Sequence, residues 1–205
     1  IRYEIPFMIF ITIILIIFGI TDMKITFLEG IFLWILFIVY LAYLFMMAKN
    51  GENQEEEKNM PIWKCLLFIL IGGILVVKGS DFAVSGASAI ARYFGMSERF
   101  IGLTIVAFGT SLPELVTSVT AAKRGNAGIA IGNIVGSNIF NILFIAGGVS
   151  LICPVPFESK FIVDTFVAIG SGCLLWLLTI HRHELNRIGG ILMLFVYVMY
   201  FIYLC

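Results

Sequence analysis

Residues 109–117 read GTSLPELVT and place a carboxylate, Glu114, directly after a proline inside the apolar run 100–122. An ionisable group at mid-membrane is costly, so it needs a partner or a water-filled cavity. Pro113 lacks an amide hydrogen, and its ring crowds the carbonyl four residues earlier, at Gly109. We therefore expect a break that leaves carbonyls near Ala107 to Gly109 without helical partners, and such oxygens must be buried in protein or line a cavity.

Two hydroxyl side chains accompany Glu114. Thr110 lies four residues before it, on the same face of a helix, and Ser111 is adjacent. Hydroxyl, carboxylate and carbonyl oxygens suit hard cations such as Ca²⁺ and Na⁺, whereas soft metals favour Cys or His. The segment predicts a cation site. The alternative is a kinked helix in which a protonated Glu114 serves only packing.

A second polar pattern follows in GNIVGSNIFNIL. Asn133, Ser137 and Asn141 recur every four positions and form a stripe on one face of an apolar helix. The intervening KRGN turn is short, which predicts that the two helices are antiparallel neighbours and that the stripe faces Glu114. Gly132 and Gly136 form a GxxxG pattern, which is typical of close helix packing. Such packing would bring the stripe to the pocket.

The composition requires a membrane protein to hold these helices. Hydrophobic residues make up 60% of the 205 residues and charged residues 13%, and the mean hydropathy is +1.06. Lys and Arg together number 13, as do Asp and Glu, which gives no support for a nucleic-acid partner. At 20 to 30 residues for a helix and its loop, roughly seven spans fill the chain.

Apolar runs bounded by charges predict an all-α transmembrane bundle. The expected helices are 5–20, 26–47, 61–92, 99–122, 127–150, 160–180 and 187–204. Lys78 and Asp81 interrupt the third run and are spaced to pair on one face. The hydrophilic segment 49–60 is expected to be a solvated linker. The distribution of Lys and Arg places this linker in the cytoplasm and the C-terminus outside.

The stretch from Gly102 to Gly147, with GTSLPE, the basic turn and GNIVGSNIFNIL, resembles an alpha repeat of the calcium/cation antiporter superfamily, most nearly its prokaryotic sodium/calcium exchangers. This resemblance implies an integral protein of the prokaryotic cytoplasmic membrane. It also implies ten helices in two inverted five-helix halves, each giving one repeat to a shared mid-membrane site. By the same match, Glu114 is one of two paired carboxylates that bind the transported Ca²⁺ and Na⁺.

The ligands that the resemblance assigns around Glu114 are Thr110, Ser111, Ser137 and the Ala107 carbonyl. Asn141, also taken as a site residue, stands where some relatives carry Asp, so the site would hold one fewer charge. No second GTSxPE-like repeat is present in the 205 residues. We therefore expect a fragment that lacks the first three helices and the partner carboxylate.

The expected organisation follows from this match. Residues 1–48 would form the last two helices of the N-terminal half, 49–60 the linker, and 61–205 the C-terminal half with its repeat at 102–147. The missing N-terminal half and the lipid bilayer would be the partners, besides the ions. The 205 residues alone are not expected to transport.

The function expected first is exchange of Ca²⁺ for Na⁺ by alternating access. It needs no cofactor and no chemical step, so the chain is not expected to be an enzyme. One alternative is Ca²⁺/H⁺ exchange, in which Glu114 titrates instead of sharing its site with Na⁺. Another is a non-transporting membrane scaffold, in which the polar stripe only joins helices through hydrogen bonds.

Overall fold

The computed structural model is almost entirely helical and describes residues 3–50, 61–180 and 184–204. Its described elements begin with helix α1 (Glu4–Asp22), strand β1 (Lys24–Ile25), and helices α2 (Phe27–Asn50) and α3 (Ile62–Tyr93). The alpha-repeat region contains α4 (Glu98–Ile101), the π-helix η1 (Gly102–Val106), α5 (Ala107–Thr110), α6 (Leu112–Lys123), α7 (Ala127–Phe140), the π-helix η2 (Asn141–Ala146) and α8 (Gly147–Ile152). Strand β2 (Val155–Pro156) and helices α9 (Lys160–Thr179) and α10 (Arg187–Leu204) complete the series.

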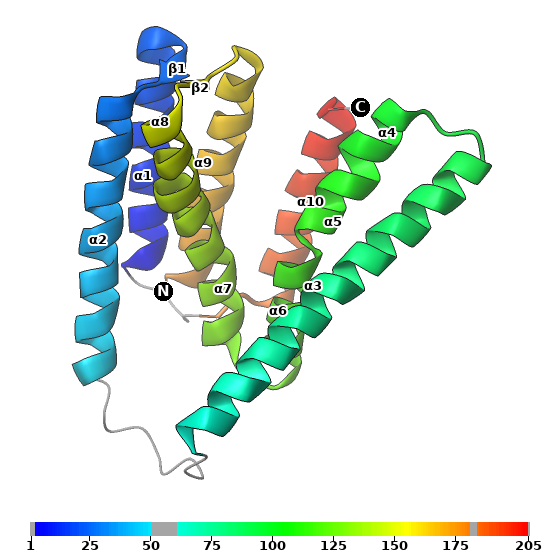
Figure 1. The fold of residues 1–205 in the computed structure, drawn as a ribbon, viewed down its shortest axis with the longest axis horizontal. Helices are drawn as coiled ribbons and strands as arrows, with labels where there is room; N and C mark the ends of the chain where they lie inside the picture. The colour runs from blue at the N-terminus through cyan, green and yellow to red at the C-terminus, as the bar shows by residue number, and fades with distance from the viewer. Residues whose placement is uncertain (1–2, 51–60, 181–183, 205) are drawn as a thin grey trace. The chain divides into compact units, whose positions relative to one another are not determined.

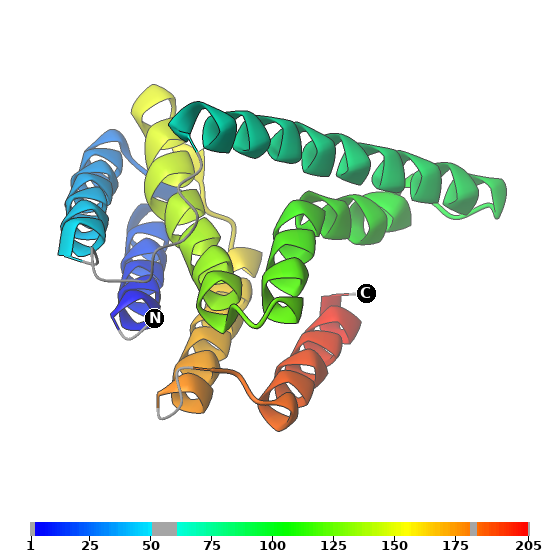
Figure 2. The ribbon, with the colours of Figure 1, turned by 90° about the horizontal axis from the view of Figure 1, so that it is seen from below.

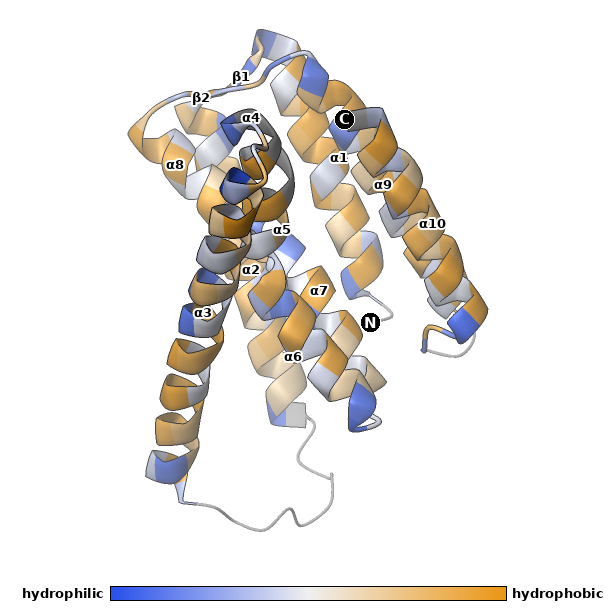
Figure 3. Ribbon diagram, turned by 90° about the vertical axis from the view of Figure 1, so that its right-hand side faces the viewer, coloured by the Kyte–Doolittle hydropathy of each residue, from blue (hydrophilic) through white to orange (hydrophobic). Residues whose placement is uncertain are grey.

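The all-α prediction is confirmed, and helices begin within one residue of all seven predicted starts. Five described helices, counting α7 to α8 as one, are long and apolar enough to cross a membrane, and α10 is slightly shorter. Figure 3 shows hydrophobic residues along most of the length of these helices. The number of spans stays a prediction, and most of the predicted linker 49–60 lies outside the described residues.

The predicted helix 99–122 contains the break that the sequence indicated. It is divided into α4, η1, α5 and α6, and the chain leaves helical geometry at Ser111, whose φ and ψ are −96° and 0°. Pro113 does not kink a continuous helix. It occupies the second position of α6, in the first turn, where its missing amide is tolerated because the first amides of a helix have no intrahelical acceptor.

The chain forms two compact units, residues 1–52 with 125–205 and residues 53–124. In the first unit, α1 packs chiefly on α9, and α2 packs chiefly on α8 and η2. These helices run side by side in Figure 1. Fully buried side chains at their centre include Ile11, Leu33, Ile139 and Leu143.

A short β-pair, which periodicity does not predict, joins two connections in the first unit. Strands β1 and β2 are antiparallel, with Ile25 opposite Val155, and the Phe157 amide donates to the Met23 carbonyl at 2.9 Å. Figure 1 shows both strands at the same end of the helices. The pair ties the connection between α1 and α2 to the one between α8 and α9.

Close helix packing in the first unit occurs at Gly30 and Gly147, where the backbones of α2 and α8 approach. A Cβ built on Gly30 would lie 3.0 Å from the Gly147 carbonyl, and one on Gly147 would lie 3.1 Å from the Leu33 Cβ. By contrast, a Cβ on Gly132 or Gly136 has no neighbour within 4 Å among the residues that the structure describes. Within the first unit, close packing therefore occurs at Gly30 and Gly147, and the packing predicted at the GxxxG pattern stays a prediction.

The π-helix η2 keeps one face of the long helix α7–η2–α8 on the core. Four α-helical residues advance about 40° beyond a full turn, so the series Ile131, Val135, Ile139, Leu143, Gly147 would rotate away from a straight partner. All five residues are nevertheless buried. A π turn holds more residues than an α turn and compensates this rotation. Its signature is the Gly147 amide, which donates to the carbonyls of Ile142 and Phe144.

In the second unit, α3 packs on α4, η1, α5 and α6, and Figure 2 shows α3 alongside this segment. Small side chains form much of the contact, since Ser80, Ser88 and Ala91 are buried on α3 and Gly109 of α5 lies against Val84. The expected pairing of Lys78 and Asp81 is confirmed at 3.9 Å between two exposed side chains. Arg92 and Glu98 form an ion pair of 2.6 Å that closes the turn between α3 and α4.

We predict that Gly30→Ala lowers stability by about 1 to 3 kcal/mol, because its methyl group would overpack the contact with α8. Gly170→Ala in α9 is the matched control, since a Cβ there meets no atom within 4 Å among the described residues. The control should be neutral or stabilising by about 1 kcal/mol through helix propensity. Thermal unfolding in detergent measures both, and equal melting temperatures for the two variants would contradict the packing.

We also predict that Gly109→Ala destabilises the second unit, because its Cβ would overlap the side chain of Val84. Val84→Ala in the same protein should restore part of the lost stability by removing the overlapping methyl groups. The measurement is a double-mutant cycle on the melting temperature, where a coupling of about 0.5 to 3 kcal/mol is expected for residues in contact. Additive effects of the two changes would show that the residues do not touch.

Candidate functional site

The predicted ligands on the broken helix lie in consecutive short elements of the second unit. Ala107 begins α5, Thr110 ends it, Ser111 forms the break, and Glu114 lies in the first turn of α6. All four therefore fall within eight residues of chain around one discontinuity. Sequence reasoning predicted this break, but not that Pro113 would lie in the first turn of a new helix.

The break redirects the hydrogen bonds of the backbone. In a continuous α-helix the Ser111 amide would donate to the Ala107 carbonyl, but here it donates to the Phe108 carbonyl at 3.1 Å. Pro113 has no amide to give to Gly109. The carbonyls of Ala107 and Gly109 thus lose their regular helical donors, which is the condition expected for backbone oxygens that bind a cation.

Ser111 occupies the N-cap position of α6 but makes no side-chain capping bond. An N-cap hydroxyl ordinarily accepts from the amide of the second or third helical residue, and the second residue here is Pro113. With one of the two usual donors removed by proline, the Ser111 oxygen is available to another electropositive partner. Its side chain is exposed.

Glu114 is half-buried, and its Oε2 atom is shielded from solvent. It is the third residue of α6, in the first turn, where the positive end of the helix dipole stabilises a carboxylate. One turn further on, the Thr117 hydroxyl donates to the Pro113 carbonyl at 2.8 Å. The start of α6 therefore combines a carboxylate with a helix N-terminus, and the Pro113 carbonyl there is hydrogen-bonded to Thr117.

The polar stripe lies on α7 and the first residue of η2, which belong to the other compact unit. Ile131, Val135 and Ile139 are buried in the core of that unit. Because α-helical residues are about 100° apart, Asn133, Ser137 and Asn141 lie on the opposite side of the helix. The stripe is thus directed away from the core of its own unit. That it meets the Glu114 segment stays a prediction.

The Ser137 hydroxyl keeps its acceptor side open. It donates to the Ile134 carbonyl at 3.1 Å, and the Asn138 side-chain amide donates to the same carbonyl at 2.8 Å. A hydroxyl that has placed its hydrogen on the backbone presents only lone pairs outward. The lone pairs of the Ser137 oxygen are therefore free to bind a cation.

Sequence reasoning missed the two π-helices. One, η1, ends directly before Ala107, and the other, η2, begins at Asn141. Single π segments occur often at functional sites, where the wide turn displaces side chains and backbone groups. The β-branched run Thr104, Ile105, Val106 offers a weak signal for η1 because such residues fit an α-helix less well. Nothing comparable precedes η2.

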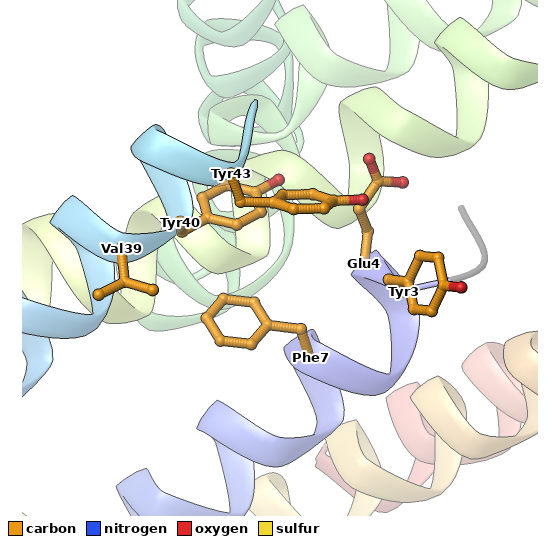
Figure 4. A pocket seen from close by; sticks show the side chains of 6 residues that line it. All are labelled: Tyr3, Glu4, Phe7, Val39, Tyr40 and Tyr43. Carbon is orange, nitrogen blue, oxygen red and sulfur yellow. The ribbon is translucent and has the colours of Figure 1, made fainter. Parts of the chain in front are cut away.

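The first unit also contains a cavity of about 260 Å³ (Figure 4). Its lining consists of Tyr3, Glu4, Phe7, Val39, Tyr40 and Tyr43. Phe7 and Tyr40 are stacked with ring centroids 5.4 Å apart. The lining contains none of the predicted ligands; Tyr3 lies at the start of α1, and Tyr40 and Tyr43 lie in the second half of α2.

Comparison with known proteins identifies the family. A model of the family described as sodium/calcium exchanger protein matches residues 64–205. The sodium/calcium exchanger MaX1 of Methanosarcina acetivorans is 43% identical over 117 residues, which are 57% of this chain and 33% of that protein. The structure of the sodium/calcium exchanger from Methanococcus jannaschii superposes with a TM-score of 0.80 at 34% identity, covering 97% of this chain and 63% of the other.

The chain spans between 33% and 66% of the length of the first three curated relatives that it matches. The family match nevertheless covers more than half of the chain, including the broken helix, the basic turn and the polar stripe. The chain belongs to the sodium/calcium exchanger protein family, a family of membrane transporters and not of enzymes.

Proposed function

We propose that the protein containing this chain exchanges Ca²⁺ for Na⁺ across the membrane, with the ions bound at Glu114. The observation that carries the proposal is the break between α5 and α6, which puts a carboxylate in the first turn of a new helix within an apolar segment. Intramembrane carboxylates mark ion pathways. Interrupted helices near the midplane form the ion sites of secondary transporters.

The proposed ligands are all oxygens. Glu114 supplies negative charge, Thr110 and Ser111 supply hydroxyls, and the Ala107 carbonyl supplies the dipole that the break releases. Ser137 and Asn141 complete this set from the face of α7 turned away from its own core. Hard cations prefer such ligands, so Ca²⁺ and Na⁺ would compete for one site.

Exchange follows from that competition when only ion-loaded states change between inward-open and outward-open forms. A negatively charged site without a cation is costly at membrane depth, which opposes the return of the empty carrier. We propose that a second acidic repeat, on an N-terminal half of the protein, supplies the partner carboxylate. The resemblance to two-repeat exchangers and the partial coverage of the relatives support this.

The same proposal places the protein in the cytoplasmic membrane of a prokaryote, with residues 49–60 on the cytoplasmic side. The excess of Lys and Arg in the connections on that side supports the orientation. Prokaryotic exchangers among its relatives support the location.

We predict that Glu114→Gln in the protein that contains this chain lowers Na⁺-driven Ca²⁺ uptake by at least about tenfold, since even groups that only support a metal ligand contribute ten- to a hundredfold. The change keeps the size of the side chain and removes its charge. The measurement is ⁴⁵Ca²⁺ uptake into Na⁺-loaded proteoliposomes, and uptake into vesicles without internal Na⁺ is subtracted as background. Melting temperatures of both proteins verify folding.

Glu158→Gln is the matched control, because it makes the same chemical change at an exposed residue paired with Lys160. It should transport like the parent protein. Uptake that ignores Na⁺ and follows a pH gradient would instead establish Ca²⁺/H⁺ exchange. Uptake that survives Glu114→Gln unchanged would leave Glu114 with a packing role, and no uptake in the parent protein would favour a scaffold.

A further inference from the structure

The side chain of Trp34 poses a problem that packing alone does not explain. Its Nε1 atom is buried and has no hydrogen-bond acceptor among the described residues. A buried indole N–H usually finds an acceptor, since leaving a buried donor unsatisfied is costly. A phenylalanine would supply aromatic surface at this position without that cost.

The indole lies against the start of α8. A Cβ built on Gly147 would lie 3.2 Å from the Trp34 Cδ1, and one built on Gly148 would lie 3.5 Å from its Nε1. The ring also contacts Phe144 of η2, with centroids 5.0 Å apart. The two glycines therefore make room for the indole, and its Nε1 edge lies close to the backbone at the start of α8.

In the same stretch of backbone, the Leu143 carbonyl does not accept from its regular α-helical donor, the Gly147 amide. In an α-helix the Gly147 amide would donate to Leu143, but it donates here to Ile142 and Phe144, on either side. Leu143 is fully buried in the cluster that Trp34 packs against. A donor in need of an acceptor and a carbonyl deprived of its helical donor thus occupy one packing layer.

We propose that Trp34 is a positioning residue for the ion site. Its indole N–H donates to the Leu143 carbonyl, directly or through one buried water, when the site is occupied. The bond stabilises the wide turn of η2 and thereby fixes Asn141, the first residue of that turn. This inference rests on the proposed function, because it concerns the ion that Asn141 would bind.

The test uses the protein that contains this chain, in proteoliposomes. Trp34→Phe keeps an aromatic ring and removes the donor. We expect the Ca²⁺ concentration for half-maximal uptake to rise roughly three- to tenfold, the effect of one hydrogen bond, with the maximal rate within about twofold. Trp176→Phe in α9 is the matched control and should leave both quantities unchanged. A half-maximal concentration equal to that of the control would overturn the proposal.

A second measurement keeps Trp34 in place. With Trp63, Trp176 and every tryptophan of the protein outside this chain changed to Phe, the fluorescence of Trp34 reports the hydrogen bonding of its own N–H. Replacing Na⁺ and Ca²⁺ by a large organic cation should shift the emission maximum to shorter wavelength, and Asn141→Ala should abolish the difference. Emission that is the same with and without ions would contradict the proposal. Na⁺-dependent uptake by the parent protein, measured in the same preparation, tests the proposed exchange separately.

Discussion

The need of every backbone amide and carbonyl for a hydrogen-bond partner constrains this chain more than any other interaction. In an apolar surrounding only a continuous helix meets that need by itself, and four described α-helices, α1, α2, α3 and α9, do so over 19 or more residues. The segment Glu98–Lys123 does not. Its interruption at Ser111 takes the regular helical donors from the carbonyls of Ala107 and Gly109, and the carboxylate of Glu114 follows within three residues. The proposed cation would bind both kinds of oxygen.

The closest helix contacts in this protein are made at glycines. Gly30 and Gly147 let α2 and α8 approach, and Gly109 lets α5 approach α3. In a membrane, close approach replaces the hydrophobic driving force that acts in water. The GxxxG pattern at Gly132 and Gly136 has no such neighbour in the described structure. It shares α7 with the polar stripe, so this side of α7 is not occupied by the core that buries Ile131 and Val135.

The two π-helices connect packing to the site. Each adjoins a predicted ligand, η1 at Ala107 and η2 at Asn141. In η2 the wide turn allows buried residues at four-residue spacing to remain on the core. The resulting backbone irregularity lies beside an indole donor that lacks an acceptor. Packing and the proposed ion binding thus depend on the same few residues, and a change that alters the packing is expected to alter the ion binding as well.

Composition and periodicity by themselves determined the class, the helices and the place of the break. Long apolar runs leave no alternative to helices, and the proline beside a glutamate in such a run indicated where the helix would break. The form of the break depended on tertiary structure, because the packing of Gly109 against Val84 and the turn at Ser111 decide whether a proline kinks a helix or begins one. The π turns, the β-pair and the glycines that pack closely were likewise decided there. Each depends on a neighbour distant in sequence, and periodicity along one helix carries no information about such neighbours.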